Sequence, residues 1–200
     1  MPTVVAVSGS LRDESYTRTG LRYALAGAAG AGADVELLDL RTYDLPPLDP
    51  DRDEQGDSGP FTAAVRSADT VLLGTPMYHG SCSGVLKNAL DHCGFDEFEN
   101  TTVGLLAVAG GSFPVTALEH LRSVCRALNA WVLPHQAALP QVRAAFEPAT
   151  VETAAGTVER AFVDEDLEAR VRKLGRRGVE YATIEPDPAT FESGQNRCPD

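Results

Sequence analysis

The chain contains 200 residues, of which 43% are hydrophobic, and carries a formal net charge of −12. Its length predicts one domain with a sizeable core, and no apolar run approaches the roughly 20 residues that a bilayer-spanning helix needs. The excess of acidic residues argues against binding to nucleic acids or to anionic membranes.

Short apolar runs alternate with segments of helical periodicity along the chain. The glycines at positions 30 and 32 end the first helix, and two stretches, 41–60 and 140–156, lack periodicity and are expected to be loops. In chain order, we expect strands over 3–8, 34–40, 70–75, 102–109 and 130–139, and helices over 15–29, 61–67, 85–92, 118–128 and from 164 onward.

This alternation predicts a parallel sheet that is covered by helices on both faces. Five strands match a flavodoxin-like doubly wound sheet with strand order 2-1-3-4-5, in a single domain over residues 1–184. The polar segment 185–200 is expected to be a poorly ordered tail. In such a sheet, ligands bind at the carboxyl ends of the strands, where the strand order reverses.

The loop after the first strand, Ser8–Thr17, has the composition of a phosphate site. It lacks the three glycines of a dinucleotide fingerprint and the lysine of a P-loop. The groups that remain are hydroxyls at positions 8, 10, 15 and 17, and Arg12 as the nearby cation that could pair with a phosphate. A second interpretation weighs equally at this point, namely an ordinary loop in which Ser15 caps the helix.

Two further loops, TPMYHGSCSG after the third strand and AGGSFP after the fourth, should converge on the same edge. Gly80, Gly110 and Gly111 would allow the backbone to approach a flat ligand, and Tyr78 could pack beside it. Together with the first loop, this chemistry is consistent with flavin mononucleotide (FMN). Loop amides can supply the hydrogen bonds that a flavin ring needs, so no catalytic side chain is expected.

The segments GSLRDESYT, TPMYHGSCSGVLKNALD and AVAGGSFP resemble the NAD(P)H-dependent FMN reductases, over roughly Thr3 to Leu139. The sequence departs from the family pattern at Thr17 and His79, where asparagine is frequent, and at Met77, where an acidic residue is frequent. Carried over to matching positions, the resemblance implies a set of cofactor-binding residues: Ser10, Arg12, Ser15, Tyr16, Thr17, Pro76, Met77, Tyr78, His79, Gly80, Ser81, Gly110, Gly111 and Ser112.

The resemblance also implies an activity and an assembly. Bound FMN would take hydride from NADPH or NADH and pass electrons to a small acceptor, such as free flavin, a quinone, an azo compound or a metal oxyanion. The helix that contains Lys87 tends to lie at a subunit interface in the family, which implies a homodimer or homotetramer. His79 is a candidate auxiliary residue, although a plain loop role is favoured.

Two alternative functions compete with this interpretation. A non-catalytic electron carrier would use the same fold and cofactor. A thiol hydrolase would use Cys82 in the G-x-C-x-G segment, with Asp96 or His120 as partners, but Cys82 lies several residues beyond the expected strand end.

The remaining expectations concern the environment and the core. The absence of a basic region before MPTVVAV indicates a cytoplasmic protein, and the four cysteines are expected to be reduced, with no metal site. The acidic, lysine-poor composition suggests adaptation to high salt. Cys125, Trp131 and Phe113 are expected to pack in the interior, and the arginines of the last helix to lie on a solvated face.

Overall fold

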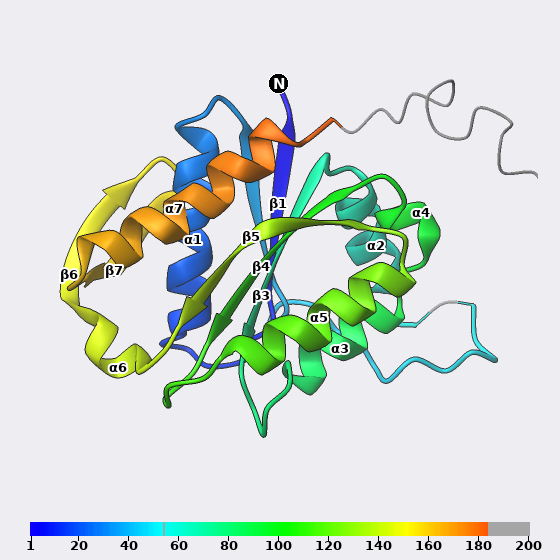
Figure 1. The fold of residues 1–200 in the computed structure, drawn as a ribbon. Coiled ribbons are helices and arrows are strands. Elements are labelled where there is room, and N and C mark those ends of the chain that lie inside the picture. Colours follow the sequence, from blue (N-terminus) through cyan, green and yellow to red (C-terminus); the bar gives the residue numbers. More distant parts are fainter. Residues whose placement is uncertain (54, 184–200) are drawn as a thin grey trace, which may run out of the picture.

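The computed structural model of the protein describes residues 1–53 and 55–183 (Figure 1). Five parallel strands form one sheet in the order β2-β1-β3-β4-β5, which confirms the predicted topology. The expected tail, 185–200, lies outside the described residues. The strands are β1 (Thr3–Ser8), β2 (Asp34–Asp39), β3 (Thr70–Pro76), β4 (Thr102–Val108), β5 (Trp131–Leu139), β6 (Phe146–Thr153) and β7 (Gly156–Phe162), and the helices are α1 (Tyr16–Ala29), α2 (Ser58–Arg66), α3 (Gly84–Asp91), α4 (Phe95–Phe98), α5 (Val115–Ala127), α6 (Val142–Ala145) and α7 (Glu165–Glu180).

Helices cover both faces of the sheet (Figure 1). One hydrophobic cluster contains residues of α1 and α7, and the other contains residues of α2, α3 and α5. Every residue of β3 and β4 is buried, which explains why their sequences are apolar runs without alternation. In β1, Val5 and Val7 face the α3 side and Val4 and Ala6 the α1 side, so alternation places Ser8 on the α1 side as well.

The helices α1 and α7 touch through their backbones. A Cβ atom at Gly27 of α1 would lie 2.1 Å from the carbonyl oxygen of Arg172, and a Cβ atom at Gly175 of α7 would lie 1.8 Å from that of Ala24. No side chain fits at either position. These two glycines are therefore required by the packing of α7 on α1, which fixes α1 against the sheet.

The expectation of a loop over 140–156 is wrong. This stretch forms α6 and then β6, which pairs with β7 in an antiparallel two-stranded sheet beside α1 (Figure 1). Phe146, Val158 and Phe162 are buried against α1, whereas most of the other residues of the hairpin are at least partly exposed. The hairpin escaped prediction because only one of its faces is apolar and because its turn, Ala154–Ala155, lacks the Asn-Gly or Asp-Gly sequences typical of tight hairpins.

Two aromatic residues also differ from expectation. Trp131, the first residue of the edge strand β5, is 47% exposed, and Phe113, in the loop after β4, is 74% exposed. Neither packs in the core. By contrast, Cys125 is fully buried, as predicted.

Two of the α7 arginines form ion pairs with acids of the same helix, Arg172 with Glu168 and Arg177 with Glu180, as expected for a solvated face. Among the described helices, none combines the length and apolarity needed to cross a membrane.

Candidate functional site

The loop between β1 and α1 is held at both of its ends. The Ser15 hydroxyl accepts a hydrogen bond from the Arg18 amide at 3.1 Å, which confirms the prediction that Ser15 caps α1. At the other end, a Cβ atom at Gly9 would lie 2.7 Å from that of Leu86, which explains the glycine. The two amides that precede Arg18 in α1, those of Tyr16 and Thr17, have no intrahelical partner and can donate to an anion at this end of the helix.

The loop after β3 makes a tight turn at His79 and Gly80. Tyr78 and Ser81 exchange two backbone hydrogen bonds of 3.0 Å, and both residues between them have positive φ angles, 51° for His79 and 81° for Gly80. A left-handed conformation at a histidine is uncommon. Histidine replaces the asparagine that the family pattern favours, and asparagine adopts this conformation more readily.

Backbone and side-chain hydrogen bonds join the loops to one another. The Ser83 hydroxyl donates to the Gly9 carbonyl at 2.6 Å, which ties the start of α3 to the first loop. The Met77 amide donates to the Val108 carbonyl at 2.8 Å. These bonds fix the relative positions of the loops, as a preorganised binding site requires.

A cleft of about 140 Å³ lies where these loops meet, at the carboxyl ends of the strands. We call it the sheet-edge cleft. Eight of the fourteen predicted cofactor-binding residues line it: Ser10, Arg12, Tyr16, Thr17, Pro76, Met77, Tyr78 and Gly110. The structure thus brings together both the predicted phosphate residues and the predicted ring residues.

The other six predicted residues do not line the sheet-edge cleft; they are Ser15, His79, Gly80, Ser81, Gly111 and Ser112. Four lining residues were missed: Val108, Ala109, Val142 and Arg143. Val108 and Ala109 directly precede the predicted Gly110. Val142 and Arg143 follow β5, whose carboxyl end lies at the same edge of the sheet as those of β1, β3 and β4. The parallel topology alone therefore indicates that they lie near the cleft.

The chemistry of the sheet-edge cleft suits a phosphate ester. Arg12 and Arg143 line it and no carboxylate does, although the protein as a whole is acidic. Ser8 Oγ is fully buried, lies at the end of β1 on the α1 side, and has no hydrogen-bond partner among the described residues. The donor groups of Arg12, Ser10 and Thr17 are therefore compatible with the phosphate of FMN, and the apolar residues beside them are compatible with part of its ring system, since the cleft is smaller than a complete cofactor pocket.

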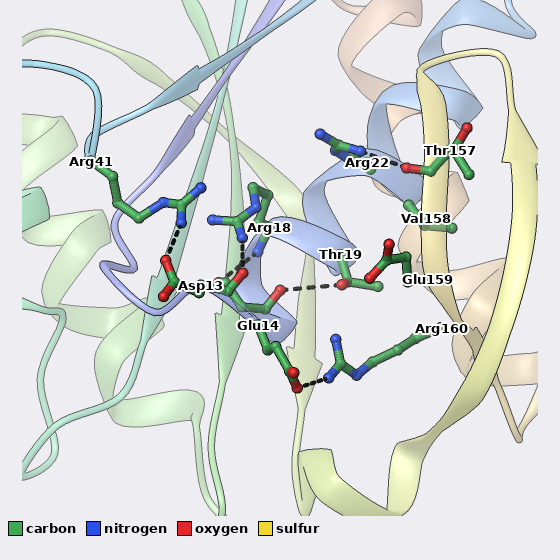
Figure 2. A pocket seen from close by; sticks show the side chains of 11 residues that line it. Asp13, Glu14, Arg18, Thr19, Arg22, Arg41, Thr157, Val158, Glu159 and Arg160 are labelled. Carbon is green, nitrogen blue, oxygen red and sulfur yellow. Dashed lines mark hydrogen bonds and ion pairs between the residues drawn. The ribbon is translucent and has the colours of Figure 1, made fainter.

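A second cavity, of about 440 Å³, adjoins the same loop between α1 and the β6–β7 hairpin (Figure 2). We call it the arginine pocket. Three of its four arginines pair with carboxylates: Arg18 and Arg41 with Asp39, Arg41 also with Asp13, and Arg160 with Glu14. The fourth, Arg22, donates a hydrogen bond to the Thr157 carbonyl. Figure 2 shows the Arg41–Asp13 and Arg160–Glu14 pairs at the two sides of this pocket. The lining residues are Asp13, Glu14, Ser15, Arg18, Thr19, Arg22, Arg41, Thr157, Val158, Glu159 and Arg160.

The electrostatics of the arginine pocket centre on Asp39. Burial would raise the pKa of this carboxyl, but hydrogen bonds from Arg41 and the charges of Arg18 and Arg41 outweigh it and hold the pKa below 3.8. Arg18 also donates to the backbone carbonyls of Arg12 and Asp13. The ion pairs therefore hold the first loop in place.

Among residues 1–53 and 55–183, Cys82 has no histidine partner. His120 lies 3.0 Å from the Ser81 hydroxyl through its Nδ1 atom, and no hydrogen bond between Cys82 and His120 occurs among the described residues. The pairing of thiol and base that a cysteine hydrolase uses is not formed. Burial raises the pKa of Cys93 and of Cys125 to about 12, so these thiols are unreactive at neutral pH.

Comparisons with known proteins identify the family of the chain. Residues 2–144 match the family model of NADPH-dependent FMN reductase. An FMN-dependent NADPH-azoreductase of Staphylococcus haemolyticus is 37% identical over 138 residues, which cover 66% of this chain and 73% of the relative. Its counterpart from Staphylococcus aureus is 36% identical over the same length.

Solved structures show the same fold. A flavoenzyme NAD(P)H:acceptor oxidoreductase from Paracoccus denitrificans superposes with a TM-score of 0.72 at 20% identity, covering 91% of this chain and 97% of that one. The apo form of an NADH:FMN oxidoreductase superposes with a TM-score of 0.68 at 21% identity, covering 98% of this chain and 97% of that one.

Proposed function

The chain belongs to the NADPH-dependent FMN reductase family, and we propose that its sheet-edge cleft holds FMN with the phosphate at the β1–α1 loop. The protein is an FMN-dependent NAD(P)H oxidoreductase that transfers electrons to a small acceptor. The observation that carries the site assignment is that phosphate-binding groups and ring-facing loops line one cleft that contains no carboxylate.

The chain's own residues have separate tasks in this site. Ser10, Thr17 and Arg12 bind the phosphate, together with the free amides at the start of α1. Pro76, Tyr78 and the neighbouring backbone orient the flavin ring, and the loop amides donate hydrogen bonds to its polar edge. The chemistry that FMN supplies when bound is hydride acceptance from a reduced nicotinamide and electron delivery to an acceptor.

Absorbance spectroscopy tests the proposed activity. The purified protein, loaded with FMN, is mixed anaerobically with NADPH or NADH, and the flavin band should bleach. The proposal is wrong if neither nucleotide bleaches the band. Bleaching only by a separate reductase protein would assign the chain as an electron carrier instead.

The acceptor is proposed to be a planar aromatic molecule, such as a quinone or an azo compound. Tyr78 is 52% exposed at the sheet-edge cleft, and Phe113 is 74% exposed three residues beyond Gly110. Exposed aromatic side chains near a flavin can stack on such substrates. Replacing Phe113 by alanine should lower kcat/KM for a quinone more than for chromate, and an equal change for both would contradict the assignment.

We propose a homodimer or homotetramer whose interface includes α3 and α5. A cavity of about 480 Å³ opens between these helices and is lined by Lys87, His120, Ser123 and Val124, among others. Light scattering on the eluting protein measures the assembly, and Ser123→Arg should shift it toward the monomer because a long charged side chain would enter the interface. A monomeric wild-type protein would contradict this proposal.

The cytoplasm is the proposed location, and high salt the proposed environment. The net charge of −12 creates self-repulsion in the folded state, which salt screens. Molar potassium chloride should therefore raise the melting temperature. An unchanged or lower melting temperature would rule out the adaptation.

A further inference from the structure

Arg143 reaches the sheet-edge cleft from a segment that is anchored to the loop after β4. The Gln141 amide donates to the Gly111 carbonyl at 2.9 Å, and the Val142 amide donates to the Ala109 carbonyl at 3.0 Å. The backbone of Gln141 is left-handed, with a φ of 46°, and turns the chain into α6, whose second residue is Arg143.

The same segment is anchored a second time, at the first turn of α1. Phe146, which follows α6, stacks on the ring of Tyr16 with a centroid distance of 5.7 Å. The guanidinium of Arg160 lies 4.8 Å from the centroid of the Tyr16 ring. Tyr16 itself lines the sheet-edge cleft, so α6 bridges the ring-facing loops and the phosphate-facing loop, with Arg143 between the two anchors.

Arg12 and Arg143 differ from most arginines of this protein in being unpaired. No carboxylate lies within ion-pair distance of either guanidinium in the part of the chain that the structure describes, and both line one cleft of about 140 Å³. The two side chains therefore border the same cleft.

A second cation would favour the binding of a flavin phosphate to this acidic protein. A phosphate monoester carries about −1.5 to −2 charges at pH 7, and the helix terminus offers only about half a positive charge. The net charge of −12 opposes the approach of such an anion. Arg12 and the helix terminus together supply about 1.5 positive charges, so a second guanidinium would neutralise the remainder and offset part of the repulsion from the net charge.

We propose that Arg143 is a second phosphate-binding residue of the FMN site and acts together with Arg12. This inference rests on the proposed function, because it takes FMN as the ligand of the sheet-edge cleft. The β6–β7 hairpin and α6 then belong to the cofactor site, since they hold Arg143 and Tyr16 in place.

Flavin titrations test the inference, because riboflavin is FMN without the phosphate. Replacing Arg143 by methionine should weaken FMN binding about ten- to hundredfold and change riboflavin binding less than about twofold. Arg143→Lys should recover part of the lost FMN affinity. Arg176, which is exposed on α7 and unpaired among the described residues, provides the charge-matched control, and Arg176→Met should leave both affinities unchanged.

Several outcomes would overturn the inference. Unchanged FMN affinity in Arg143→Met would do so, including the case in which KM for NADPH rises, because Arg143 would then serve the nucleotide. An equal loss for FMN and riboflavin would indicate a structural role. Failure of the wild-type protein to bind FMN would instead refute the proposed function, so the two failures can be told apart.

Discussion

The sheet-edge cleft and the arginine pocket adjoin the same loop and both contain arginines, but most of these arginines differ in whether they form ion pairs. In the arginine pocket, Arg18, Arg41 and Arg160 are paired with carboxylates, whereas Arg12 and Arg143 in the sheet-edge cleft have no such partner among the described residues. The paired arginines fix the backbone, and the unpaired ones are available to an anionic ligand. The larger cavity, 440 Å³ against 140 Å³, is thus the supporting one.

The largest expected effect comes from a change that disturbs both cavities. Replacing Gly175 by alanine would place a Cβ atom 1.8 Å from the Ala24 carbonyl, so α1, which forms a wall of both cavities, must move. We expect the free energy of unfolding, measured by urea titration, to fall by about 3 kcal/mol.

The control for this variant is Gly59→Ala. Gly59 lies in α2, and a Cβ atom there would meet no atom within 4 Å. Its replacement should be neutral or slightly stabilising. If Gly175→Ala were equally harmless, the close contact between α1 and α7 would be refuted.

Loss of the unpaired cation in the first loop should affect binding and leave the fold intact. Arg12→Met should weaken FMN binding by about 1.5–3 kcal/mol, or about ten- to hundredfold, because a charge-assisted contact to the phosphate disappears. The melting temperature of the unliganded protein should hardly change, since Arg12 is exposed and unpaired among the described residues. Unchanged FMN affinity would remove Arg12 from the phosphate site.

Loss of a paired cation should have the reverse pattern. Arg18 has only 14% of its side chain exposed and links Asp39 to the carbonyls of Arg12 and Asp13. We expect Arg18→Met to lower the free energy of unfolding by about 2 kcal/mol and to weaken FMN binding less than Arg12→Met does. Arg126→Met, which removes an exposed charge from α5, is the control and should be nearly neutral.

The smallest expected effect is the loss of the Asp39 ion pairs at low pH. The pKa of Asp39 is lower in the folded protein than its ordinary value of 3.8. The charged carboxylate therefore stabilises the fold above pH 3.8, and this stabilisation is lost as the pH falls through the lower pKa of the folded protein. Asp39→Asn should therefore be less stable than wild type by about 1 kcal/mol at pH 7. The difference should shrink below about pH 4. A pH-independent difference would contradict the ion-pair assignment.

The central sheet could be predicted because its signals are local. The residues of β3 and β4 form uninterrupted apolar runs, and α1 begins at a capping serine and ends beside Gly30, so each boundary could be read from a few neighbouring residues. Converging loops at one sheet edge then follow from the parallel topology. Most of the cleft was predicted on this basis, supplemented by the family resemblance.

The missed parts depend on contacts between distant segments. Arg143 enters the cleft because α6 binds the loop after β4, and Phe146 is buried because Tyr16 stacks on it. Neither contact leaves a periodic signal in residues 140–156. Trp131 was assigned to the interior because aromatic residues usually pack, but it begins an edge strand, where one side of the chain remains open to solvent.

The backbone contact between α1 and α7 also has a consequence for biosynthesis. α1 is complete after residue 29, but the helix that packs on it ends at Glu180, so a ribosome must translate nearly the whole described chain before the two can meet. Until then, the side of α1 that includes Ala24 and Ala28 lacks its final cover. Such late long-range closure is slow and leaves an aggregation-prone surface on the nascent chain, which is where molecular chaperones would act.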